Sequence, residues 1–315
     1  MQSDRLHPPQ SVWMPVVFGA LGLALACVSS PPIHESRPDL LRREIASDVT
    51  RLSPSAVVIP HEISEQTLRV IDARVSELGR GVRGARGLLS VLFGPEHFNL
   101  GYEWAVTRDA ESTIAVGAGN CVSLSAVLVG AARAYGGAAR YVEIRSNLER
   151  HDDGDLEVWS SHVAVLLPSR EGPLIVDFLD LVDPAKLRFR ILSDRSLVAH
   201  YYNDRGYELI YRARSAGQET PWEEARQQFE IATEIDEGLS RAWNNLGVTL
   251  TRLGDLEAAE AAYRRALDGR HTYLGEATVL NLASLESRRE LERKPDLDDG
   301  CFPMPNSDHE CESSE

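Results

Sequence analysis

The spacing of apolar residues predicts that the ordered part of the chain begins with helices. Residues 62–79 form an amphipathic pattern with near-helical spacing, carried by Leu68, Ile71, Val75 and Leu78. A shorter helix is expected over 39–48, inside a stretch that otherwise resembles a linker. A turn rich in glycine and arginine is expected over 79–87, and an apolar element follows at 88–93.

A second, more apolar segment places a cysteine at the start of a helix. Residues 122–135 are largely apolar, and Gly136 and Gly137 follow them, as is common beyond the end of a helix. The preceding residues, 117–120, are mostly small and flexible. We therefore predict a buried helix that begins at or next to Cys121.

Three segments after this helix have the pattern of strands. They cover 140–144, 159–167 and 173–178, with a polar loop between the first two. His162 lies in the second strand and Asp177 in the third. If these two strands pair antiparallel, His162 and Asp177 can face each other across the ladder.

From about residue 207 the pattern becomes entirely helical. The period is that of a 34-residue helix-turn-helix repeat, carried by Trp243, Leu246, Gly247, Leu250, Gly254, Ala259, Tyr263 and Ala266. One period earlier, the second helix of another repeat is indicated by Ala225, Phe229 and Ala232. Its first helix, over about 208–216, matches poorly. Further on, Asn281 opens a segment similar to the one at Asn245, so we predict two repeats and a capping helix that ends near Arg293.

The amino-terminal region has the pattern of an export signal. Residues 12–26 form an apolar run of about the length of a signal h-region, shorter than the roughly 20 residues that span a membrane. The run ends at Ala26, and a small residue directly before Cys27 resembles the lipobox of bacterial lipoproteins. We expect export and lipidation of Cys27, with a plain cleaved signal or a short uncleaved anchor as alternatives.

The charge of the chain argues against a nucleic-acid partner. The net charge is −15, with 33 basic and 48 acidic residues and no basic cluster that could follow a phosphate backbone. Part of the acidic excess lies in 294–315, a stretch with little apolar content that we expect to be a disordered tail.

The four cysteines have different expected roles. With Cys27 assigned to lipidation, Cys301 and Cys311 could pair in an oxidising compartment. That leaves Cys121 alone, and catalysis is one reason for an exported protein to keep a free thiol.

Cys121, His162 and Asp177 have the chemistry of a nucleophile, a base and an orienting carboxylate. A thiolate is favoured at a helix amino terminus and beside an imidazolium. Backbone N–H groups at the same terminus can hold the oxyanion of a tetrahedral intermediate. Histidine transfers the proton, and a carboxylate on its other nitrogen fixes the tautomer.

The motifs around these residues resemble the transglutaminase-like superfamily. The resemblance covers about 88–180 and is carried by Gly119-Asn120-Cys121 before an apolar helix, Arg140-Tyr141-Val142, His162-Val163-Ala164-Val165 and Val176-Asp177. It implies a papain-like fold with a Cys-His-Asp triad. Together with the repeats, the chain looks like a group of bacterial transglutaminase-like lipoproteins, and some members of the superfamily bind without catalysing.

Several other polar groups compete for a functional role. Asp180 and Asp183 are alternatives to Asp177, which we favour because it ends the strand. The acidic run 151–155 lacks the rest of a calcium loop and is better explained as a solvated hairpin. The cluster at 200–203 and Trp159 are interpreted as packing, although either could line a cleft.

These patterns predict an α+β, papain-like/transglutaminase-like domain followed by an all-α solenoid of tetratricopeptide repeats. The expected parts are a signal peptide and lipobox, a linker, the transglutaminase-like domain, the repeats and the tail, over 1–27, 28–59, 60–205, 206–293 and 294–315. The predicted location is the periplasmic side of the cell envelope.

The predicted activity is cysteine-dependent acyl transfer from an amide, completed by water or by an amine. We expect no metal or organic cofactor, a protein or peptide partner on the repeats, and a lipid anchor in the membrane. The alternative is an inactive envelope scaffold that binds its partner through the repeats.

Overall fold

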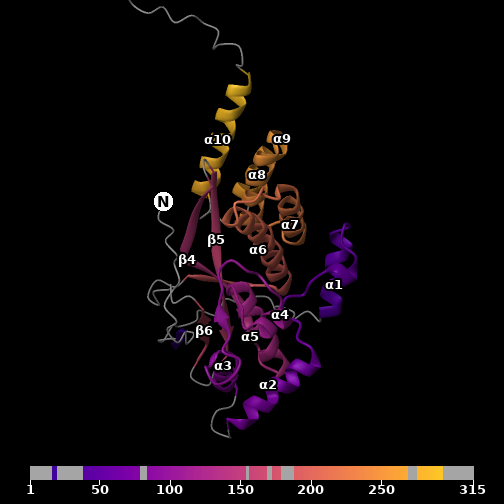
Figure 1. The fold of residues 1–315 in the computed structure, drawn as a ribbon, viewed down its shortest axis with the longest axis vertical. Coiled ribbons are helices and arrows are strands. Elements are labelled where there is room, and N and C mark those ends of the chain that lie inside the picture. Colours follow the sequence, from indigo (N-terminus) through magenta and orange to yellow (C-terminus); the bar gives the residue numbers. More distant parts are fainter. Residues whose placement is uncertain are drawn as a thin grey trace, which may run out of the picture.

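The structure of the protein is a computed structural model (Figure 1). It describes residues 16–19, 38–78, 84–153, 156–168, 172–178, 188–268 and 275–293. The predicted lipidation site Cys27, the predicted tail and the cysteines Cys301 and Cys311 lie outside these residues.

Three helices lie between residues 38 and 93. They are α1 (Pro38–Asp48), α2 (Glu65–Glu77) and α3 (Ala85–Phe93), and a short 3₁₀ turn, Pro54–Ala56, follows α1. The helices predicted within 39–48 and 62–79 are confirmed. Helix α2 starts later than predicted because Ser64 caps it, and the Ser64 side chain accepts a 3.2 Å hydrogen bond from the Thr67 backbone.

Helix α5 (Cys121–Ala134) is the predicted buried helix and begins at Cys121. Before it lie helix α4 (Ala110–Val116) and two short parallel strands, β2 (Gly101–Tyr102) and β3 (Ala118–Gly119). The end of α5 is followed by Gly136, whose φ of 74° suits glycine. Cys121 therefore stands at the junction of a strand and a helix.

The main sheet has five antiparallel strands in the order β1-β6-β5-β4-β7. Their bounds are Val16–Gly19 for β1, Arg140–Asp153 for β4, Leu156–Leu167 for β5, Leu174–Asp177 for β6 and Phe189–Leu192 for β7. The three predicted strands are confirmed as β4, β5 and β6, although β4 and β5 are longer than expected. Strands β4 and β5 form a long hairpin that extends alongside α8 and α10 (Figure 1).

Two edge strands were not predicted from the sequence. Strand β7 pairs with β4, and β1 pairs with β6, where Val16 lies opposite Asp177. Residues 16–19 belong to the apolar run assigned to the export signal. The same residues therefore have two candidate uses, as part of a signal and as an edge strand.

The second half of the chain is a stack of helices. It contains α6 (Asp194–Ser215), α7 (Trp222–Ile235), α8 (Ser240–Leu253), α9 (Leu256–Asp268) and α10 (Gly275–Arg293). The predicted domain boundary at 205/206 falls inside α6. This helix begins beside the sheet and continues into the repeats (Figure 1).

The two predicted repeats share one packing device. In α8, a Cβ atom added to Gly247 would lie 2.5 Å from the Tyr263 ring, and in α6 a Cβ atom added to Gly206 would lie 2.8 Å from the Phe229 ring. In both pairs an aromatic ring from the second helix lies directly against a glycine of the first. The close approach of each helix pair therefore requires glycine.

The sheet, α5 and the first repeat helices share one hydrophobic core. Fully buried residues of α5 and β5, such as Leu128 and Val163, belong to the same cluster as Ala232 of α7 and Ala242 of α8. A separate cluster fills the space between the later repeat helices. The repeats are thus joined to the sheet by apolar packing.

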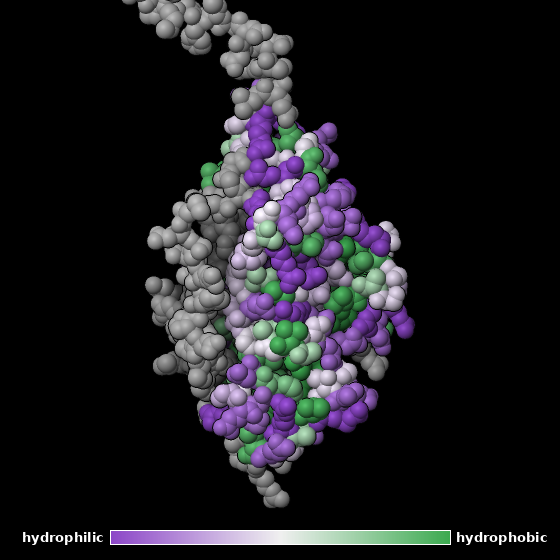
Figure 2. All heavy atoms as spheres, viewed as in Figure 1, coloured by the Kyte–Doolittle hydropathy of each residue, from purple (hydrophilic) through white to green (hydrophobic). Residues whose placement is uncertain are grey.

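The visible described surface is mostly hydrophilic, with apolar residues in small groups (Figure 2). Within the described residues, no helix has both the length and the apolar character needed to cross a membrane.

Candidate active site at the start of helix α5

The amino terminus of α5 is built to hold Cys121 in a fixed position. Asn120 caps the helix, and its side-chain Oδ1 accepts a 3.0 Å hydrogen bond from the Ser123 backbone. Gly119 precedes it, and a Cβ atom there would lie only 2.5 Å from Cβ of Ser123. Cys121 itself is buried, with 7% of its surface exposed. The first backbone N–H groups of a helix have no partner within that helix, so they are donors suited to an anion.

His162 and Asp177 come from neighbouring strands. The register of β5 and β6 pairs Val165 with Val176, so Asp177 is one step further along, opposite Ala164, with His162 as its diagonal neighbour on the same face. His162 Nε2 forms a hydrogen bond and ion pair with Asp177 Oδ1. Both side chains are buried. The sequence predicts that His162 and Asp177 face each other across an antiparallel ladder, and they do contact each other across β5 and β6, as diagonal neighbours.

The pKa of His162 reflects these neighbours. Burial lowers it, because a charged ring is costly away from water. The hydrogen bond to Asp177 and the interaction with the nearby Cys121 outweigh burial, and the pKa of His162 rises to about 10. The ring is therefore an imidazolium at neutral pH.

The second ring nitrogen of His162 is the one that remains for the thiol. Within the described residues, His162 Nδ1 is buried and has no partner at normal hydrogen-bond geometry. Cys121 lies near enough to raise the pKa of His162, and Nδ1 is the ring nitrogen that Asp177 does not occupy. Cys121, His162 and Asp177 thus form one buried cluster.

The other candidate residues from the sequence lie partly outside the described residues. Asp180 and Asp183, the alternatives to Asp177, lie outside the described residues. The backbone of 151–153 is in strand β4, and the side chain of Trp159 is not among those described. Among the described residues, no group of three or more His, Cys, Asp or Glu side chains is arranged to hold a metal ion.

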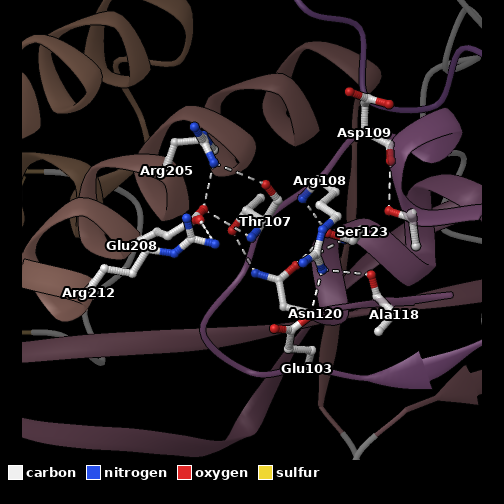
Figure 3. A network of polar contacts seen from close by, with 11 residues as sticks. Glu103, Thr107, Arg108, Asp109, Ala118, Asn120, Ser123, Arg205, Glu208 and Arg212 are labelled. Carbon is white, nitrogen blue, oxygen red and sulfur yellow. Dashed lines mark hydrogen bonds and ion pairs between the residues drawn. The ribbon is translucent and has the colours of Figure 1, made fainter. Parts of the chain in front are cut away.

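A polar network beside Cys121 was not predicted from the sequence (Figure 3). Asn120 Nδ2 donates a 2.8 Å hydrogen bond to Thr107 Oγ1, and the Thr107 backbone donates a 3.2 Å hydrogen bond to Glu208 Oε2. Arg205 and Arg212 also contact the Glu208 carboxylate, at 2.7 Å and 2.9 Å. The sequence signal for this network was the spacing of Arg205, Glu208 and Arg212, which puts the three side chains on one helix face.

A second network joins the sheet to the repeats. Glu143 of β4 is buried and lies 3.2 Å from Arg190 of β7. His200 of α6 is 4.0 Å from Glu143, and His200 Nδ1 accepts a 2.7 Å hydrogen bond from Arg241 of α8. The cluster at 200–203 therefore includes ionisable groups, in addition to the buried rings that the sequence predicted as packing.

Comparison with known proteins identifies only the repeat region. The tetratricopeptide repeat family matches residues 240–268, which are α8, α9 and their connection. Tetratricopeptide repeats generally mediate interactions between proteins. No curated protein and no solved structure matches the chain. The protein therefore contains a tetratricopeptide repeat of the kind used as a protein-interaction module.

Proposed function

We propose that the protein is a cysteine-dependent acyl-transfer enzyme with a papain-like, transglutaminase-like domain. The proposal rests on one observation: buried His162 is bound through Nε2 to Asp177 and interacts with Cys121 at the first turn of α5. These are the contacts that an activated thiol nucleophile needs. A histidine with a purely structural role has no need of a thiol beside it.

In the proposed reaction, the sulfur of Cys121 attacks the carbonyl carbon of an amide. The resulting oxyanion lies against the backbone N–H groups at the amino terminus of α5. His162 donates its proton to the leaving amine as the carbon–nitrogen bond breaks, which leaves a thioester on Cys121. Water or a second amine then attacks the thioester and gives its proton to His162, and Cys121 leaves as the thiolate beside the restored imidazolium. Asp177 holds the ring in position and stabilises its charge.

Alkylation of Cys121 tests this proposal. Iodoacetamide should modify Cys121 at neutral pH about 100-fold faster in the wild type than in His162→Ala, because the histidine supplies the activation. Peptide mass spectrometry separates Cys121 from the other three cysteines. Equal rates in the two proteins would exclude an activated nucleophile.

A second function, favoured by the repeat match at 240–268, is that of an inactive scaffold that binds a protein partner. Two strains distinguish these functions: one carries Cys121→Ser, and the other produces a protein that lacks residues 256–293. The enzyme requires Cys121, so its substitution should reproduce the loss of the whole gene. A normal phenotype with Cys121→Ser, combined with a defect in the truncated strain, would favour the scaffold.

Export and lipidation of Cys27 are part of the proposal. The supporting pattern is the apolar run 12–26 followed directly by cysteine. Cys27→Ser should move the protein from the membrane fraction to the soluble envelope fraction. Mass spectrometry of the amino terminus decides between the two uses of residues 16–19, because a mature chain that begins at Cys27 has lost strand β1.

A further inference from the structure

Two carboxylates of α6 lie against the segment that leads to Cys121. Asp204 and Glu208 are one helical turn apart and therefore share a face of α6. Neither belongs to the cluster of Cys121, His162 and Asp177. Asp204 accepts a hydrogen bond from Asn120, the residue directly before Cys121 in the chain. Glu208 accepts one from Thr107, whose hydroxyl is bound to Asn120.

Asp204 accepts hydrogen bonds from three donors on three helices. Its Oδ2 lies 3.5 Å from Nδ2 of Asn120, at the cap of α5. Its Oδ1 lies 3.1 Å from Nδ2 of Asn203 and 3.4 Å from the guanidinium of Arg241 in α8. Asn203 in turn accepts a 3.0 Å hydrogen bond from Asn245 of α8. The start of α5 is thus connected through Asp204 to the first helix of the matched repeat.

Glu208 holds Asn120 indirectly, through Thr107. It is 3% exposed, and it accepts the backbone N–H of Thr107, whose hydroxyl accepts from Asn120. Arg205 bridges the two, with 2.7 Å to Glu208 and 3.5 Å to the Thr107 carbonyl (Figure 3). Removing this carboxylate would leave a buried backbone donor without its acceptor, which the segment could relieve only by moving.

The cost of keeping Asp204 charged argues for a role beyond stability. Burial raises the pKa of Asp204, and the charge of Arg241 and the hydrogen bond from Asn203 only partly offset this. A carboxylate in this environment contributes less to stability than one in water. Ionisable groups whose pKa is shifted by burial concentrate at functional sites.

We infer that Asp204 and Glu208 are positioning residues. Through them, helix α6 fixes Asn120 and hence the sulfur of Cys121 relative to His162. The inference rests on the proposed function for its catalytic meaning. Reaction rates fall steeply when a nucleophile is displaced by about 1 Å, so these remote contacts affect reactivity without touching the reacting atoms.

The test measures alkylation of Cys121 by iodoacetamide in the full-length chain. Asp204→Asn and Glu208→Gln should each slow the reaction by about 10- to 100-fold, because an amide places a donor where every neighbour is a donor. Thr107→Val removes only the hydroxyl that holds Asn120, and it should slow the reaction in the same direction. Thr107→Ser, which keeps the hydroxyl, should restore the wild-type rate.

Two further variants separate positioning from general loss of structure. Glu260→Gln removes ion pairs with Arg264 and Arg289 far along the repeats, and it should leave the rate unchanged. When His162→Ala is added to Asp204→Asn, it should cost much less than it does in the wild type, because a displaced thiol no longer benefits from the ring.

Wild-type rates in Asp204→Asn, Glu208→Gln and Thr107→Val, with unchanged melting temperatures, would overturn the inference. If the two carboxylate variants fail to fold, Thr107→Val and Thr107→Ser still decide it. Equal alkylation of the wild type and His162→Ala would instead overturn the proposed function. The two failures are therefore distinguishable.

Discussion

At the scale of single residues, the neighbours of His162 determine what its ring can do. Burial alone would favour the neutral form, yet the Asp177 carboxylate and the Cys121 thiol shift the balance toward the charged form. The ring therefore holds a proton that it can give to a leaving amine. Its chemistry depends on two partners that are 15 and 41 positions away in the chain.

Asp177→Asn should separate the charge of this carboxylate from its hydrogen bond. The amide can still accept a hydrogen bond from Nε2 but no longer stabilises the imidazolium, so the pKa of His162 should fall below its present value of about 10. Titration of the His162 ring by NMR measures the change. Glu143→Gln is the matched control, since it also removes a buried carboxylate on the sheet. An unchanged pKa in Asp177→Asn would contradict the assigned pairing.

The same pKa predicts how stability changes with pH. His162 titrates near 6.5 in the unfolded chain and near 10 in the folded protein. The folded state thus binds the proton more tightly, so the stabilising contribution is complete below about pH 6.5 and is lost as pH rises through 10. The difference in melting temperature between wild type and His162→Gln should shrink between pH 6 and pH 10. A constant difference would mean that the ring is not charged in the folded protein.

Some residues of the site could be predicted from the sequence, and others could not. Cys121 could be placed because a segment of small, flexible residues before an apolar helix is a local signal. Glu208 could not be connected to Thr107, since the two are 101 positions apart and no local pattern links them. Contacts of this kind depend on how helices pack, and packing is not encoded in periodicity.

At the scale of elements, the repeats show why the helix predicted over about 208–216 was misplaced, since α6 covers Asp194–Ser215. Gly206 and Phe229 are 23 positions apart, whereas the equivalent Gly247 and Tyr263 are 16 apart. The extra residues lie partly in the longer end of α6 and partly in its connection to α7, which covers 216–221. A fixed 34-residue period therefore found the second helix of the first repeat and misplaced the first helix.

Gly247→Ala should destabilise the repeats by about 1–3 kcal/mol, because the added methyl group would overlap the Tyr263 ring. Urea denaturation measures the loss. Tyr263→Leu removes the ring, so adding it to Gly247→Ala should cost much less than the sum of the two single changes. Strictly additive losses would show that the ring is not the obstacle.

At the scale of the whole molecule, the helical repeats and the sheet depend on each other. Ala232 of α7 and Ala242 of α8 lie in the core cluster that contains α5 and the sheet. At the surface of the same junction, Trp104 packs edge-on against Tyr207 and Tyr211, with 5.8 Å and 4.9 Å between ring centroids. A boundary drawn from composition at 205/206 could not reveal this, because a change of pattern along the chain does not coincide with a gap in packing.

The shared core predicts a single cooperative unfolding transition. Tryptophan fluorescence and far-UV circular dichroism should report the same melting temperature. A chain truncated before α7 should fail to fold, because it exposes apolar surface of the sheet domain. Truncation before α10 should cost less, since that helix lies at the end of the stack. Two separated transitions in the full chain would contradict the shared core.

The long connection between α6 and α7 also makes the protein practical to study. Residues 214–219 are exposed, and Gly217 has a φ of 64°, as expected of a turn. Exposed loops of this kind tolerate inserted residues. A fluorescent label placed there would follow directly on the end of α6, about one turn beyond Arg212, which contacts Glu208, and would report movements of the helix without altering either core.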